Sequence, residues 1–344
     1  MKTKTTLLAA LACSACVTTP APIDSLPAVS VTATAETAPV GTAAADAADD
    51  PAIWRNPADP AKSLIVATDK KAGLHVYGLG GASKNFDPSG RLNNVDLLDM
   101  GDRGVIVAAS DRNDPLNARL RLYRLDTAAA KLMPLGVVEG GKGEAYGVCL
   151  WRNGSALHAF SVLKDGTIEE YRLDGLDGAT PTATRVLTRK LKTQTEGCVA
   201  DPRNGTLYVG EEDVGVWRFA QGQAQGVLVA PADGKHLVMD TEGLAILPEG
   251  AGGGYLVASS QGDNAYALYR LPGMEPAGRF RIAAGPFGAT EETDGIELKG
   301  GDFGPDYPEG LFVAQDGHNQ PHAQNFKLVS WKAVMEAVEG ANGR

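Results

Sequence analysis

One sequence feature limits the possible folds of this chain more than any other: a short pattern that recurs six times. Each copy begins with a polar residue, usually followed by Gly, and continues with alternating apolar positions, as in Glu196-Gly197-Cys198-Val199-Ala200. The residues that begin the copies are Asp50, Asn94, Tyr146, Glu196, Glu242 and Asp294, so successive copies are 44, 52, 50, 46 and 52 residues apart. A period of about fifty residues has room for four short strands, which is typical of a β-propeller blade.

Short strands separated by tight turns fill these units. Runs such as 63–68 and 157–162 are rich in apolar and β-branched residues, and Asn153-Gly154 and Asp165-Gly166 favour two-residue hairpins. We therefore predict an all-β fold, a six-bladed β-propeller of four-stranded blades, rather than a β-sandwich whose spacing arises by chance. Helical spacing is confined to the stretch 330–338 near the C-terminus.

The N-terminal part of the chain is expected to help close the propeller. Residues 29–35 alternate between β-branched and small residues, which predicts a strand. Because the open edges of a propeller must be covered, this strand is expected to complete the last blade beside 311–314 and 326–331. The propeller domain would then span 29–344, and the Pro-, Ala- and Thr-rich residues 17–28 would be a flexible tether.

Residues 1–16 have the features of a lipoprotein-type export signal. Lys2 and Lys4 precede an apolar run at 7–12 that is too short to span a bilayer. Small residues come before Cys13 and Cys16, either of which is a candidate for lipidation. We expect an exported protein, either a periplasmic or outer-membrane lipoprotein or a secreted protein, with membrane contact only through the lipid anchor.

Two further cysteines, Cys149 and Cys198, lie within the propeller. An oxidising compartment would permit a disulfide between them. They occupy different offsets within the repeat, however, and alternate positions of a strand point to opposite faces of a sheet. The sequence therefore predicts free thiols.

The polar residues that begin the copies would form a ring at one end of the central channel. Several carboxylates on one ring repel one another strongly unless some are protonated or cations lie among them. A single acid is commonly a solvated loop residue, but scattered surface acids would not share one phase of a repeat. Oxygen ligands without a His or Cys cluster indicate a hard cation such as Ca²⁺.

Basic residues recur after the strand that follows a ring residue. Lys70, Lys71, Arg112 and Lys164 all occupy such positions. If the blades are equivalent, these side chains reach the same face as the acids, where they and bound cations would hold phosphate groups. Taken singly, each lysine would be an ordinary surface residue. No Gly-x-Ser-x-Gly motif is present and the five His are scattered, so metal-activated water is favoured over a covalent nucleophile.

Several stretches, in order along 35–331, resemble the β-propeller phytases. The run 46–54, Asp-Ala-Ala-Asp-Asp-Pro-Ala-Ile-Trp, resembles one signature of that family, and Asn93-Asn94-Val95-Asp96 resembles another. Further similar stretches are 69–74, 194–197, 211–213, 259–262, 293–296 and 311–317. The resemblance implies a six-bladed propeller that uses several Ca²⁺ ions to hydrolyse phosphate monoesters of phytate and lower inositol phosphates, releasing inorganic phosphate as a 3-phytase does.

The resemblance also assigns the residues of the site. The implied calcium ligands are Asp49, Asp50, Glu196, Glu211, Glu212, Asp240, Glu242, Asp294, Asp316 and Asn319. The implied phosphate-binding residues are Lys70, Lys71, Arg112, Tyr146 and Lys164, and these together with Glu196 are the expected catalytic residues. His318 stands where family members often carry an acid, and the surroundings of Arg112 and Lys164 differ from the family pattern.

The charge of the chain limits its partners. A net charge of −10 disfavours nucleic acid, which requires a basic face. We expect a small-molecule substrate and a monomer. Two other functions stay open: a calcium-dependent propeller hydrolase of another class, such as a lactonase, and a non-catalytic surface-binding propeller. Lys70, Lys71, Arg112 and Lys164 argue against the lactonase, because a lactone needs no such cations.

Overall fold

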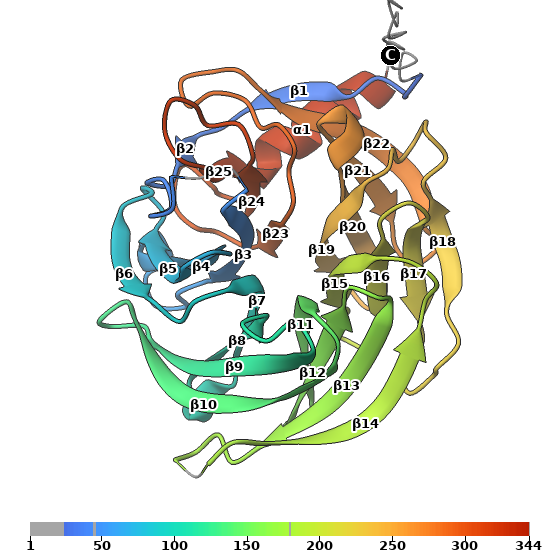
Figure 1. The fold of residues 1–344 in the computed structure, drawn as a ribbon. Coiled ribbons are helices and arrows are strands. Elements are labelled where there is room, and N and C mark those ends of the chain that lie inside the picture. The colour runs from blue at the N-terminus through green and yellow to red at the C-terminus, as the bar shows by residue number, and fades with distance from the viewer. Residues whose placement is uncertain (1–23, 44–45, 179, 344) are drawn as a thin grey trace, which may run out of the picture.

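The computed structural model describes residues 24–43, 46–178 and 180–343, and it confirms the six-bladed β-propeller (Figure 1). Six sheets surround a central channel, and the strand of each sheet that lies at a copy of the repeated pattern is the innermost. The predicted export signal and most of the predicted tether lie outside the described residues. Within the described ranges, we find no helix with the length and apolar character needed to cross a bilayer.

The strands of the blades follow one another along the chain from the channel outward. Blade 1 contains β3 (Ala48–Trp54), β4 (Leu64–Asp69), β5 (Gly73–Gly78) and β6 (Ser83–Asp87). Blade 2 contains β7 (Leu92–Asp99), β8 (Val105–Asp111), β9 (Asn117–Asp126) and β10 (Lys131–Lys142). Blade 3 contains β11 (Ala145–Asn153), β12 (Ala156–Leu163), β13 (Thr167–Asp174) and β14 (Thr182–Lys190).

The second half of the ring has the same order. Blade 4 contains β15 (Thr195–Ala200), β16 (Leu207–Glu211), β17 (Gly215–Phe219) and β18 (Val227–Pro231). Blade 5 contains β19 (Thr241–Glu249), β20 (Gly253–Ser260), β21 (Ala265–Arg270) and β22 (Glu275–Ala283). Blade 6 contains β23 (Ile296–Gly300), β24 (Gly310–Asp316) and β25 (Asn325–Ser330). Three short 3-10 helices, η1 (Pro60–Lys62), η2 (Gly101–Arg103) and η3 (Gln261–Asp263), lie between strands.

The N-terminal segment closes the ring across two blades rather than one. β2 (Ala35–Glu36) pairs antiparallel with β25 and completes blade 6, as predicted. β1 (Val29–Thr32) instead pairs parallel with β22 and adds a fifth strand to blade 5, so the prediction that 29–35 joins the last blade was wrong for this part. The chain bends between the two strands, which lets Val31 pack into the core beside Phe280.

Deletion of residues 29–36 is expected to lower the melting temperature by about 5 °C or more, since each kcal/mol of stability corresponds to a few degrees in a domain of this kind. The deletion removes both strand pairings and exposes the outer edges of β22 and β25. Differential scanning calorimetry of the full and shortened chains checks this. An unchanged melting temperature would contradict closure by this segment.

The C-terminal helix covers the junction of the last two blades. α1 (Trp331–Asn342) extends the predicted helical stretch, and its buried residues Trp331, Val334 and Val338 lie on one face. They belong to a core cluster shared by blades 5 and 6, and α1 contacts β1, β22, β24 and β25 (Figure 1). The helix therefore reinforces the part of the ring that the two chain ends close.

Each of the first five innermost strands has a shift of register near its start. In β3 the shift lies between Ala48 and Pro51, and in β7 it lies between Leu92 and Val95. β11, β15 and β19 have the same irregularity at the equivalent point. A β-bulge adds a residue to one strand and changes the direction of its side chains, and bulges are common beside functional sites. The repeat detected in the sequence thus marks a repeated bulge at one end of the channel.

The bulges show that the predicted ring residue of blade 1, Asp50, is wrong by one position, and that Asp49 is the ring residue. The N–H of Gly243 donates to the carbonyl of Asp294 at 2.8 Å, and the N–H of Gly295 donates to the carbonyl of Asp49 at 3.0 Å. Asp49 therefore occupies in blade 1 the place that Asp294 occupies in blade 6. Asp50 occupies the place of the glycine instead.

The same correction applies to blade 2. Val95 pairs with β8 as Pro51 pairs with β4, so Asn93 rather than Asn94 is the ring residue. In both blades two polar residues stand where the other copies have a polar residue and a glycine, and the sequence pattern alone did not distinguish between them. The corrected ring consists of Asp49, Asn93, Tyr146, Glu196, Glu242 and Asp294.

The glycine after a ring residue is required by the close approach of neighbouring innermost strands. A Cβ atom on Gly147 would lie 1.9 Å from the carbonyl oxygen of Glu196, and one on Gly197 would lie 2.1 Å from that of Glu242. These obstacles are backbone atoms, which no side-chain rotation can move. The innermost strands therefore approach one another closely at the channel, where a glycine fits because it has no side chain.

Cys149 and Cys198 form a disulfide with Cα atoms 5.8 Å apart, so the prediction of free thiols was wrong. The two residues lie on β11 and β15, the innermost strands of neighbouring blades. Neighbouring blades of a ring meet through opposite faces, and residues of opposite offset therefore point toward each other. The alternation of side chains applies within one sheet and does not apply between two sheets.

The double substitution Cys149→Ala/Cys198→Ala is expected to reduce the free energy of unfolding by about 2–4 kcal/mol, because the bond closes a loop with a sequence separation of 49. Activity at 25 °C should not change, since both sulfurs lie in the core cluster between blades 3 and 4. Urea unfolding monitored by tryptophan fluorescence measures the effect. The same midpoint in oxidised and substituted protein would show that the bond does not stabilise the fold.

Candidate active site

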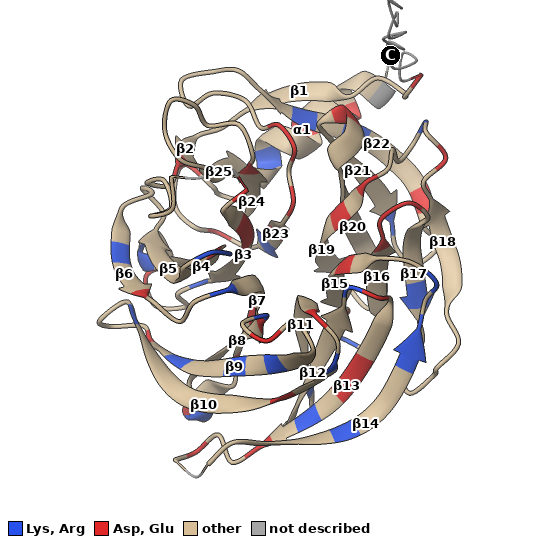
Figure 2. Ribbon diagram, viewed as in Figure 1, with Lys and Arg blue, Asp and Glu red and all other residues tan. Residues whose placement is uncertain are grey.

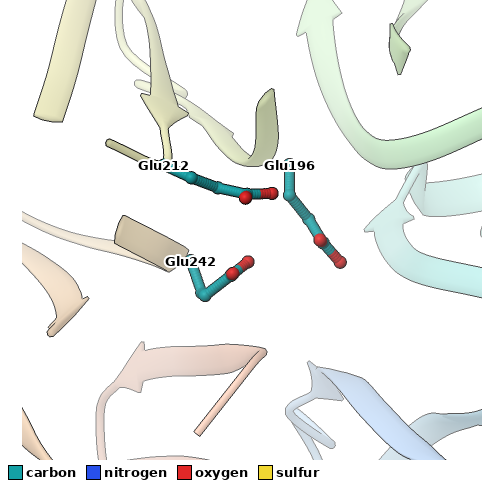
Figure 3. Close-up of side chains that lie close together, drawn as sticks. All are labelled: Glu196, Glu212 and Glu242. Carbon is teal, nitrogen blue, oxygen red and sulfur yellow. The ribbon is translucent and has the colours of Figure 1, made fainter. Parts of the chain in front are cut away.

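Three glutamates gather at the mouth of the channel where blades 4 and 5 meet (Figure 3). Glu196 is in the bulge of β15, Glu242 is in the bulge of β19, and Glu212 is in the turn after β16. One carboxylate oxygen from each lies within 4.8 Å of those of the other two, so the group could hold a metal ion. All three were implied as metal ligands by the resemblance, and the structure brings them together.

The protonation of these carboxyl groups reflects their crowding. Burial, followed by the charge of Asp294, raises the pKa of Glu196 to about 7. Burial and then the charge of Glu196 also raise the pKa of Glu242, and the two carboxyl groups are close enough to share a hydrogen bond. Buried like charges at this separation favour either a shared proton or a cation between them.

Several carboxylate oxygens of the mouth accept no hydrogen bond within the described residues. They are both oxygens of Asp49, Oε1 of Glu212 and Oε2 of Glu242. Asp49 is fully buried, and burial raises its pKa although the nearby charge of Lys70 opposes the shift. Buried polar atoms almost always have partners, so unpaired oxygens from three blades fit a bound hard cation.

Lys70 brings a positive charge to the same carboxylates. Its Nζ lies 2.8 Å from Oδ2 of Asp294 and 3.9 Å from Oδ2 of Asp49, and it also contacts Asp46. Burial alone would lower the pKa of Lys70, but the surrounding carboxylates, Asp49 and Asp294 foremost, raise it above its ordinary value. Lys71 is more exposed and pairs with Asp46 at 3.4 Å. Lys70 therefore stays charged at the mouth.

A second cationic group surrounds Tyr146 across the channel. The guanidinium carbon of Arg112 lies 4.9 Å from the ring centre, and Nζ of Lys164 lies 4.8 Å from it. Lys164 also donates to the hydroxyl of Tyr146 at 3.0 Å. Arg112 donates to Glu144 at 2.5 Å and to the side-chain oxygen of Asn93. Burial, followed by the charge of Glu196, raises the pKa of the Tyr146 hydroxyl, which therefore stays protonated.

A cavity of about 670 Å³ joins these groups, which is within the range for small-molecule sites. Its charged and aromatic lining residues are Asp46, Lys70, Lys71, Arg112, Tyr146, Glu196, Glu242, Glu292, Asp294, His318 and His322, and the amide of Asn319 also lines it. Figure 2 shows acidic and basic segments interspersed around the central channel. The cavity therefore presents carboxylates and cations to one ligand.

Two other predicted ligands lie near this group. Asp294 accepts a hydrogen bond from Nε2 of Gln261 at 2.6 Å in addition to its pairing with Lys70. Asp240 is half-buried in the turn before β19, where burial and then the charge of Asp213 raise its pKa. Neither the structure nor the spacing of these oxygens assigns an ion to them, so their roles stay predictions.

Three predicted ligands are engaged by protein groups. Glu211 accepts hydrogen bonds from the backbone of Lys192, from Thr193 and from Nε1 of Trp217. Asp316 pairs with Nζ of Lys327 at 3.2 Å, and Oδ1 of Asn319 accepts from the same Nζ at 3.2 Å. Side chains of the fold thus already contact these oxygens.

Asp50 and His318 lie at the limits of the predicted site. Oδ2 of Asp50 accepts from the N–H of Val95 at 3.0 Å and faces a second cavity of about 480 Å³ further along the channel. Asp50 therefore joins blades 1 and 2 below the mouth.

His318 is exposed at the mouth, with Nδ1 3.0 Å from Glu291 and Nε2 3.4 Å from Glu292.

No role in the site was predicted for Asn93 or Gln261, although both touch carboxylates of the mouth. Nδ2 of Asn93 donates to Oε1 of Glu196 at 2.6 Å, and Gln261 donates to Asp294. The signal for Asn93 was present in the repeat, one position before the residue that was chosen. Gln261 follows β20 outside the repeat, and the sequence carries no spacing signal for it.

Fold and site together define a β-propeller that has a cluster of three carboxylates able to hold a metal ion, and a cavity lined by acidic and basic side chains, at the mouth of its channel. A family model described as Phytase matches residues 1–342. The 3-phytase of Bacillus subtilis (strain 168) is 41% identical over 326 residues, which cover 89% of this chain and 85% of that protein. The chain belongs to the phytase family.

Proposed function

We propose that the chain hydrolyses phosphate monoesters of phytate and lower inositol phosphates, and that the reaction depends on calcium. The observation that carries the proposal is the cluster of Glu196, Glu212 and Glu242 at the mouth of the channel. Two of its members, Glu196 and Glu242, line one cavity with Lys70 and Arg112. Membership of the phytase family and the likeness to a Bacillus 3-phytase support the substrate class. The enzyme is a phosphoric monoester hydrolase.

Calcium would be held by the three glutamates, with Asp49 and Asp294 beside them. The donor set consists of carboxylate oxygens, which hard divalent cations prefer, and some of these oxygens have no other partner among the described residues. When bound, such an ion polarises the phosphate and lowers the pKa of water. Asp50, Glu211, Asp240, Asp316 and Asn319 stay candidate ligands on the family resemblance alone.

The cationic side chains would hold the substrate. Lys70 and Lys71 on one side and Arg112 and Lys164 on the other supply N–H donors for the oxygens of two neighbouring phosphates. Charge that builds on the equatorial oxygens during transfer would be offset by the same groups. Binding a second phosphate would orient the first for attack by water.

The experiment that tests the function measures inorganic phosphate released from phytate with and without added Ca²⁺. Release that requires Ca²⁺ is expected. A lactone substrate in the same buffers separates the alternatives: turnover of the lactone alone would indicate a lactonase, and turnover of neither substrate, with phytate still bound, would indicate a binding protein. Either outcome would overturn the proposal.

We also propose that the protein is exported and monomeric. The Cys149–Cys198 disulfide supports export, because such bonds persist in oxidising compartments. Lipidation at Cys13 or Cys16 would place the enzyme on a membrane, and cleavage without lipidation would release it. Cell fractionation of Cys13→Ala and Cys16→Ala variants tests the anchor, and light scattering of the purified protein tests the monomer.

A further inference from the structure

The side-chain amide of Asn93 lies between two groups of the site that differ in chemistry. Its Nδ2 donates to Oε1 of Glu196 at 2.6 Å, and its Oδ1 accepts from Nη1 of Arg112. Asn93 is in the bulge of β7 and its exposed fraction is 1%. One buried side chain thus touches a carboxylate of the metal-binding cluster and a cation of the phosphate-binding group.

The chemistry of the two neighbours determines the orientation of the amide. An ionised carboxylate can only accept hydrogen bonds and a guanidinium can only donate them, so the amide nitrogen must face Glu196 and the oxygen must face Arg112. A carboxylate at position 93 would repel Glu196, and an ammonium would repel Arg112. An amide satisfies both partners at once.

The surroundings hold both Asn93 and Arg112 in place. In the same bulge, the N–H of Asn94 donates to Oγ of Ser110 at 2.8 Å, and Ser110 in turn donates to the carbonyl of Tyr146. Arg112 is fixed further by Glu144 at 2.5 Å and by the ring of Tyr146. Within the described residues, Nε of Arg112 is left without a partner. Arg112 as a residue lines the cavity of the site, so a ligand there can meet its guanidinium group.

We propose that Asn93 is a positioning residue that couples phosphate binding at Arg112 to cation binding at Glu196. The inference rests on the proposed function of the site. A phosphate that engages Arg112 shifts or fixes the amide, and the amide fixes the carboxylate that holds the cation. Coupling of this kind is reciprocal, so the cation strengthens phosphate binding through the same hydrogen bonds.

Two substitutions distinguish the role of the amide nitrogen of Asn93 from that of its amide oxygen. Asn93→Ala removes the hydrogen-bond partner of both Glu196 and Arg112. It is expected to weaken Ca²⁺ binding about 10-fold, because a group that orients a metal ligand is lost. It is also expected to raise KM for phytate. Asn93→Asp keeps an oxygen for Arg112 but places a carboxylate against Glu196. It is expected to leave KM near that of the native enzyme and to lower kcat at least 10-fold.

The measurements are titration calorimetry with Ca²⁺ alone, steady-state kinetics on phytate and melting temperatures. Asn117→Ala is the matched control, since Asn117 is an amide of the same blade that bonds exposed Asp114 and Lys142 away from the site. If Asn93→Ala does not fold, Asn93→Asp, which is equal in size, carries the test.

The outcomes distinguish this inference from the proposed function. If the native enzyme releases no phosphate from phytate, the proposed function fails, but the calorimetric change in Ca²⁺ binding still tests the link from Asn93 to Glu196. If the native enzyme is active and Asn93→Ala matches Asn117→Ala within twofold in Ca²⁺ affinity, kcat and KM, the coupling is refuted. An equal rise in KM for Asn93→Asp and Asn93→Ala would also refute it.

Discussion

Treatment of the purified protein with a strong chelator is expected to abolish phosphate release from phytate, with a loss of at least about 100-fold that added Ca²⁺ restores. The carboxylates at the mouth repel one another without a cation, and the polarising charge is then missing from the cavity. A phosphate-release assay with chelator, followed by excess Ca²⁺ or Mg²⁺, measures the effect. Activity that persists in the chelator would refute the dependence on a divalent ion.

The chelated protein should also become less stable as the pH rises. The pKa of Glu196 is raised to about 7 from an ordinary value of 4.5, and those of Asp49 and Glu242 are raised as well. In this window the native state holds more protons than the unfolded state, so the free energy of unfolding falls between about pH 4.5 and 7. Saturating Ca²⁺ should remove this fall, because it neutralises the ionised cluster.

Melting temperatures at several pH values, with chelator and with Ca²⁺, check that expectation. A bound ion stabilises the native state by about 2.7 kcal/mol for each site when its concentration is 100 times Kd. The two curves should therefore converge at low pH, where protons replace the ion, and separate toward neutral pH. Curves that stay parallel would show that the carboxylates of the mouth do not govern stability.

Glu196→Gln is expected to lower kcat on phytate by about 100-fold or more, since it removes one charged oxygen ligand from the centre of the cluster. The amide is equal in size, so the fold should persist. In chelator the variant should be as stable as the native protein or more stable, because one repelling carboxylate is gone. In Ca²⁺ it should gain less stability than the native protein.

The control for this substitution is Glu249→Gln, at the exposed far end of β19. It should behave as the native enzyme does in both assays. If Glu196→Gln lost activity and stability to the same extent in chelator and in Ca²⁺, Glu196 would be a structural residue rather than part of the cation site.

The architecture could be predicted from sequence because the propeller repeats its geometry. Six copies of a polar residue before an alternating run, about fifty residues apart, record six innermost strands, the first five of which have a bulge at the same height. The glycine in four copies reports the contact between neighbouring strands, as Gly197 shows. Where that glycine is replaced, at Asp50 and Asn94, the phase of the pattern is ambiguous and the ring was placed one residue too late.

Features that depend on contacts between blades were not accessible in the same way. The different offsets of Cys149 and Cys198 within the repeat predicted that their side chains point to opposite faces. The two residues instead lie in neighbouring sheets and form a disulfide. The division of the N-terminal segment between blades 5 and 6 consists of pairings with β22 and β25, which no local pattern in the segment reveals.

The closure of the ring by β1 and β2 has a consequence for how the molecule is made. The partners of these strands, β22 and β25, are synthesised only when translation is almost finished. A nascent chain therefore carries its first strands unpaired for nearly the whole of synthesis, with exposed edges that invite aggregation. Chaperones that hold the emerging chain extended would keep those edges apart until the final blade arrives.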